Sequence, residues 1–81
     1  MNTFSIQLNT PKDVYDFVAA ASSCPKDIGL SVSHEKYEVD ARSLMGIFSL
    51  NLSEPVTVKM SGETNLINTY SKVFDKWSVE E

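Results

Sequence analysis

The spacing of the apolar side chains changes several times along this chain, and each change marks a different kind of element. Alternating apolar and polar residues are typical of a strand with one buried face, whereas apolar residues three and four positions apart are typical of an amphipathic helix. The strongest helical signal lies near the C-terminal end, and its members are Leu66, Ile67, Tyr70, Val73, Phe74 and Trp77. This signal predicts a last helix, after a turn over residues 61–64, with its apolar stripe against the core.

A second helix is predicted near the N-terminal end. Thr10 is a suitable N-cap, and Pro11 suits the first helical position. The residues that follow at helical spacing are Val14, Phe17, Val18 and Ala21. Pro25 cannot continue a helix, so we expect this one to end near residues 22–24.

Alternating patterns predict strands over residues 4–8, 28–33, 37–41 and 56–60. A short helix is predicted over residues 43–50. The order β-α-β-β-α-β-α predicts an α+β fold, an open-faced β-sandwich whose four-stranded antiparallel sheet carries its helices on one face. We expect a single domain over residues 1–81. The predicted core comprises Phe17, Val18, Leu30, Val39, Val58, Phe74 and Trp77. The predicted solvated face of the sheet carries Ser5, Gln7, Ser31, Thr57 and Lys59.

Composition excludes several classes of function. The net charge is −4 and the basic residues are scattered, which disfavours nucleic-acid binding. The start of the chain does not resemble a signal peptide, and no apolar run approaches the roughly 20 residues of a membrane span. Cys24 is the only cysteine, so no internal disulfide is expected. These features fit a cytoplasmic protein with no membrane insertion.

Chemical motifs are also missing from the sequence. There are no paired carboxylates, no nucleophile with a base, and no glycine loop for a phosphate, so we expect no enzyme, no catalytic residue and no cofactor. His34 lies in a predicted tight turn over residues 34–36 and is interpreted as an exposed turn residue. No cluster of Cys, His and Asp at metal-ligand spacing accompanies it, so no metal site is expected.

The segment after residue 42 is apolar nearly all round. Ile47 and Leu50 form one face, which can satisfy the core. A second face consists of Leu44, Met45 and Phe48. This second face is predicted to be a surface for a partner protein, because methionine and aromatic side chains are favoured at interfaces. The alternative is that it packs under a neighbouring connection as hidden core.

Residues 42–50, Arg-Ser-Leu-Met-Gly-Ile-Phe-Ser-Leu, resemble the segment around the regulatory serine of the histidine-containing phosphocarrier proteins, the HPr family. Residues 39–40, 56–58 and 61–62 also fit the family pattern. The resemblance spans essentially the whole chain and implies the HPr fold. It also implies that Ser43 is a regulatory phosphorylation site, whereas the residue pattern alone favours a helix N-cap there.

The N-terminal motif of the family is degenerate in this chain. In the family, a loop before the first helix carries the histidine that holds the transferred phosphoryl group. Residues 9–13 contain no histidine and form a shorter loop, so that the histidine position falls on Thr10 or Lys12, depending on the gap. The resemblance therefore implies a family member that has lost phosphocarrier chemistry.

The expected function is a binding or regulatory module that acts through the short helix after Ser43. The expected partner-binding residues are Arg42, Leu44, Met45 and Phe48. The resemblance implies partners among phosphotransferase-system enzymes, an HPr kinase or a transcription factor of carbon catabolite regulation. Two alternatives stay open: a structural or scaffold domain that has only the HPr fold, and a phosphocarrier with an unconventional acceptor.

Overall fold

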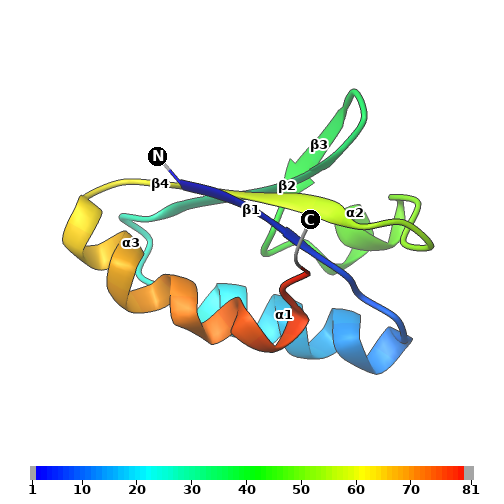
Figure 1. The fold of residues 1–81 in the computed structure, drawn as a ribbon, viewed down its shortest axis with the longest axis horizontal. Coiled ribbons are helices and arrows are strands. Elements are labelled where there is room, and N and C mark those ends of the chain that lie inside the picture. The colour runs from blue at the N-terminus through cyan, green and yellow to red at the C-terminus, as the bar shows by residue number, and fades with distance from the viewer. Residues whose placement is uncertain (1, 80–81) are drawn as a thin grey trace.

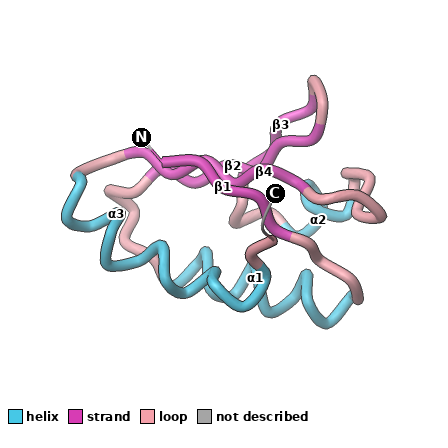
Figure 2. Tube along the Cα trace, viewed as in Figure 1, coloured by secondary structure: helices cyan, strands magenta, loops and turns pink. Residues whose placement is uncertain are grey.

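A sheet with helices on one of its faces makes up the computed structural model, which describes residues 2–79 (Figure 1). Its strands are β1 (Asn2–Ile6), β2 (Gly29–His34), β3 (Tyr37–Asp40) and β4 (Val56–Ser61). Its helices are α1 (Pro11–Ser23), α2 (Leu44–Phe48), α3 (Thr64–Tyr70) and the 3₁₀ helix η1 (Ser71–Trp77). The strand order is β1-β4-β2-β3, and all neighbouring strands are antiparallel. The predicted fold class is confirmed (Figure 2).

Helix α1 begins and ends where its sequence signals place it. The extended backbone of Thr10 lets its Oγ1 accept a hydrogen bond from the Asp13 N–H, at 3.1 Å. The stripe that faces the sheet comprises Val14, Phe17 and Ala21, all buried. The helix stops before Pro25, as predicted.

The strand register produces one apolar row and one polar row across the sheet. Phe4 pairs with Val58, which pairs with Val32, which pairs with Val39. Because side chains alternate between the faces, this row points toward the helices. The next row carries Ser5, Thr57, Ser33 and Glu38 on the other face. The predicted polar face is thus confirmed. The five residues predicted for it are half-buried rather than fully exposed: Ser5, Gln7, Ser31, Thr57 and Lys59.

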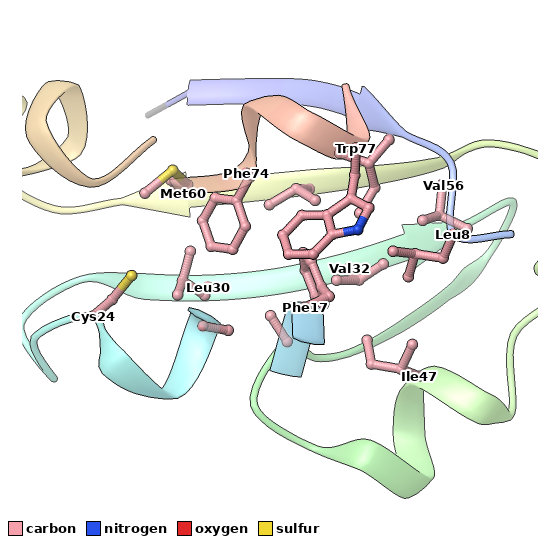
Figure 3. Close-up of a cluster of buried hydrophobic side chains, with 14 of the residues drawn as sticks. Leu8, Phe17, Cys24, Leu30, Val32, Ile47, Val56, Met60, Phe74 and Trp77 are labelled. Atoms are coloured by element: carbon pink, nitrogen blue, oxygen red, sulfur yellow. The ribbon is translucent and has the colours of Figure 1, made fainter. Parts of the chain in front are cut away.

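Three aromatic rings occupy the centre of the core (Figure 3). Phe17 of α1 lies 5.2 Å from Phe74 and 5.7 Å from Trp77, between ring centroids. Of the predicted core, Phe17, Leu30, Val58, Phe74 and Trp77 are buried, while Val18 and Val39 pack against it half-buried.

The C-terminal helical segment differs from the prediction. It is not one α-helix, because α3 gives way at Ser71 to the 3₁₀ helix η1. Residues three apart share a face of a 3₁₀ helix, so Phe74 and Trp77 are both buried. Val73, predicted to lie on the core stripe, is instead 38% exposed, and Tyr70 is half-buried.

The first strand also ends earlier than predicted. It stops at Ile6, the last residue that pairs with β4, whereas the prediction ran to residue 8. The Gln7 N–H donates to the carbonyl of Trp77 at 2.8 Å, and the Val79 N–H donates to the carbonyl of Ser5 at 3.1 Å. The segment after η1 therefore lies along the outer border of β1. Among residues 2–79, no helix combines the length and the apolar character needed to cross a membrane.

Candidate functional site

Ser43 and the buried side of α2 fix the position of this short helix. Ser43 has extended backbone angles, and its Oγ accepts a hydrogen bond from the Gly46 N–H at 3.1 Å. Ile47 is fully buried and Leu50 nearly so, as their spacing predicted. Ser43 is therefore the N-cap of α2, and Ile47 and Leu50 hold the helix against the core.

The other face of α2 is largely open to solvent. Met45 is 81% exposed and Phe48 is 42% exposed. Leu44 departs from the prediction, because it is half-buried and packs against the core. The ring of Phe48 meets the ring of Tyr15 on α1 edge-on, with the centroids 5.9 Å apart, and Tyr15 is also more than half exposed. We call Tyr15, Met45 and Phe48 the α1–α2 apolar surface.

A groove of about 290 Å³ adjoins this surface beside Phe48. It is lined by Leu8, Asn9, Thr10, Pro11, Val14, Phe48, Leu52 and Ser53. Most of the lining is apolar. The fold thus brings Thr10, one of the two degenerate phosphohistidine positions, to the same groove as Phe48 of α2.

The second degenerate position, Lys12, does not line that groove. Its ammonium contacts the Asp16 carboxylate at 2.7 Å, and this hydrogen bond raises the pKa of Lys12 and lowers the pKa of Asp16. Both groups are exposed, so water screens the pair and it contributes little to stability. The nearby N–H groups are also occupied, because Asp13 donates to Thr10 and Asn9 donates to the Asp13 carboxylate at 3.0 Å.

Arg42 is engaged inside the protein. Its Nη2 donates to the carbonyls of Pro25 and Ile28, at 3.1 and 3.2 Å, and lies 3.5 Å from the carbonyl of Cys24. These contacts hold the α1–β2 connection against the start of α2. Arg42 therefore has a structural role, and the partner-binding role predicted for it stays a prediction.

The interpretation of His34 as an exposed turn residue is wrong. Its side chain is only 13% exposed, and its Nε2 lies 2.8 Å from Oε1 of Glu54. Alternation along β2 places His34 on the same face as the buried Val32, which explains its burial. Glu35 and Glu54 also lie near His34, with one possible ligand atom from each of the three side chains within 4.8 Å of the others, a grouping that sequence spacing did not predict.

Tyr15 is the functional candidate that sequence reasoning missed. It falls outside the α1 stripe, which indicates only that it is exposed. Its contact with Phe48 depends on how α1 packs against α2, and no local pattern encodes that packing.

No protein-family model matches the chain, and no curated protein matches it significantly. Among solved structures, the crystal structure of HPr-C-His from Thermoanaerobacter tengcongensis is similar to it, with a TM-score of 0.70. The match covers 94% of this chain and 93% of that chain at 22% sequence identity. This likeness shows that the chain has the HPr fold.

Proposed function

We propose that this chain is an HPr-fold binding module that recognises another protein through the α1–α2 apolar surface and carries no phosphoryl group. The observation behind the proposal is the exposure of Met45 and Phe48 on a helix whose opposite face is buried. Large apolar side chains clustered in this way are typical of protein–protein contact sites. A flexible methionine adapts to a partner, and aromatic rings anchor it.

The loop before α1 supports the second half of the proposal. A phosphocarrier needs an acceptor with free donors around it, and residues 9–13 offer no histidine. The side chain of Thr10 already caps α1, and the carboxylate of Asp13 lies at the same helix end. A phosphoryl group on Thr10 would meet that negative charge.

Ser43 is proposed as the gate of the surface. A phosphate on Ser43 would add about −1.5 to −2 charges at the N-terminus of α2, where the helix dipole tolerates them. The charge would lie two residues from Met45, so it would disfavour apolar docking or favour a partner that carries arginine. Arg42 is the neighbouring cation, and its Nη2 already donates to loop carbonyls.

The partner classes that we propose are phosphotransferase-system enzymes, an HPr kinase and a transcription factor of carbon regulation, all in the cytoplasm. The HPr fold and the serine segment support this choice. A scaffold domain outside sugar transport is the alternative, because one fold can carry unrelated functions.

Direct binding measurements test the surface. Each purified candidate partner from the same cell is immobilised and titrated with wild type, Met45→Asp, Phe48→Asp and the control Tyr37→Asp. Tyr37 is a comparably exposed aromatic on β3, 65% exposed. Met45→Asp and Phe48→Asp should weaken binding about tenfold or more, because each places a charge in the apolar contact. A tenfold loss corresponds to about 1.4 kcal/mol of binding free energy. Tyr37→Asp should leave binding unchanged.

Two outcomes would contradict the proposal. Circular dichroism showing that Met45→Asp and Phe48→Asp unfold the chain would make these residues core. Folded wild type that binds none of the candidates would favour the scaffold alternative.

A phosphotransfer assay tests the loss of carrier chemistry. The protein is incubated with radiolabelled phosphoenolpyruvate and the upstream phosphotransferase enzyme, with an HPr as positive control. We expect no acid-labile label on this chain. A label that persists in His34→Ala would establish an unconventional acceptor and overturn this part of the proposal.

A further inference from the structure

Three side chains with metal-binding atoms meet where β2 turns into β3. They are His34, Glu35 and Glu54, and one ligand atom from each lies within 4.8 Å of the others. We propose that they form a binding site for a divalent transition-metal ion, with Zn²⁺ as the best match to the donors. The site lies outside the α1–α2 apolar surface. The HPr-like features of the chain do not require it.

The sheet register explains why these residues meet although Glu54 is distant in sequence. β2 and β4 are antiparallel, and Ser33 pairs with Thr57. Continuing that register by one and two residues brings His34 and Glu35 beside residues 54–56, where the chain enters β4. The cluster therefore joins the tip of the β2–β3 hairpin to the end of the α2–β4 connection.

The donor set suits zinc. Zinc binds histidine nitrogen at about 2.0–2.1 Å and carboxylate oxygen at about 2.0–2.2 Å, which separates tetrahedral donors by about 3.3 Å. The His34 and Glu54 atoms, now 2.8 Å apart, need only a small outward movement to reach that spacing. Glu35 is exposed, so its side chain is free of packing constraints and can close on the ion. Water would take the fourth position.

The charge around the cluster also favours a cation. Over residues 2–79, the lysines that form ion pairs contact Asp16 and Glu38, and no lysine or arginine pairs with Glu35 or Glu54. Two carboxylates thus lie beside one imidazole, and neither is paired with a lysine or arginine among residues 2–79. The ring of His34 is already held in place by its burial, so binding an ion does not require the ring to be ordered.

An imidazole donor predicts selectivity. Nitrogen ligands favour Zn²⁺, Ni²⁺ and Cu²⁺, whereas Mg²⁺ and Ca²⁺ prefer sites made of oxygen alone. We therefore expect an excess of Mg²⁺ to leave Zn²⁺ binding unchanged. Competition by Mg²⁺ would indicate diffuse attraction to the carboxylates and would contradict the site.

Titration calorimetry of the full chain without a histidine tag, with zinc chloride as the probe, tests the proposal. Wild type should bind one Zn²⁺ saturably. Losing even a supporting contact around a metal ligand typically weakens affinity about 10–100-fold, so His34→Gln and Glu54→Gln should each lose at least about tenfold. The matched control is Glu63→Gln, an exposed glutamate before α3 whose side chain makes no capping hydrogen bond.

The design remains decisive if the half-buried His34 variant folds poorly. Glu54 is exposed, so Glu54→Gln should keep the fold and carry the test alone. Thermal unfolding gives a second readout, because a ligand that binds only the folded chain raises Tm with its concentration. The proposal fails if wild type shows no saturable uptake at millimolar zinc. It also fails if Glu54→Gln binds zinc as tightly as wild type and the control Glu63→Gln do.

Discussion

Arg42 and Ser43 are neighbours in the sequence and have unrelated tasks in the structure. The cap formed by Ser43 was predictable, because its acceptor role is local and involves Gly46, three residues away. The contacts of Arg42 were not predictable, since the carbonyls that it binds lie 14 to 18 residues earlier in the chain. The contact of His34 with Glu54, 20 residues away, was unpredictable for the same reason, whereas its burial follows from β2 running one residue further than predicted.

Cys24 gives a prediction at this scale. Burial raises the pKa of its thiol above the ordinary value of 9.0, and the nearby Arg42 offsets only part of this effect. Iodoacetamide should therefore modify Cys24 more slowly in the folded protein than in urea at the same pH, because the thiolate is the nucleophile. Mass spectrometry over time gives both rates.

The same shift fixes the sign of a pH effect. As the pH rises past 9.0, the thiol of the unfolded chain ionises before the folded one, so folding stability is lost in that window. Below pH 9.0, the contribution of Cys24 to stability is complete.

In the labelling experiment, equal iodoacetamide rates for the folded and unfolded protein would show that the thiol is accessible and would contradict its burial.

Among the elements, the last helix shows what a periodic pattern leaves undetermined. Apolar residues at positions 70, 73, 74 and 77 fit an α-helix, and the pair Phe74 and Trp77 fits a 3₁₀ helix equally well. The packing of both rings against Phe17 accompanies the tighter helix. Sequence patterns located the segment correctly but could not separate the two kinds of helix.

Phe74 and Val73 provide a matched pair of variants in η1. Phe74 is fully buried and contacts the rings of Phe4, Phe17 and Trp77, so Phe74→Ala should lower the free energy of unfolding by about 3–5 kcal/mol. Val73→Ala should cost far less, because Val73 is 38% exposed. Urea denaturation midpoints measure both changes. Similar midpoints for the two variants would mean that η1 faces the core differently.

For the whole molecule, the fold was more predictable than the candidate site. Alternation and helical spacing are repeated along every element, so together they determine the layers, and the serine segment pointed to the HPr fold. The groove beside Phe48 has lining residues from three stretches of chain, near residues 8–14, 48 and 52–53. The groove forms only when α1 packs against α2 and against the connection that follows α2.

The border of β1 gives a prediction for the molecule as a whole. Val79→Pro removes the N–H that donates to Ser5, whereas Val79→Ala keeps it. Unpaired strand borders promote association between chains. Val79→Pro should therefore self-associate at lower concentration than Val79→Ala, as measured by sedimentation velocity. Identical sedimentation of the two variants would show that this contact does not protect the border.

The two borders of the sheet are consequently unequal. The segment after η1 covers β1 near Ser5 and Gln7, while β3, on the opposite side, has no further strand beside it among residues 2–79. A strand donated by a second copy would find at β3 a border with no neighbouring strand among residues 2–79. Two copies joined along β3 would form one continuous sheet whose outer strands are the two β1 strands, each contacted near Ser5 and Gln7 by the segment after η1. Such an assembly would close as a symmetric pair instead of growing into a fibre.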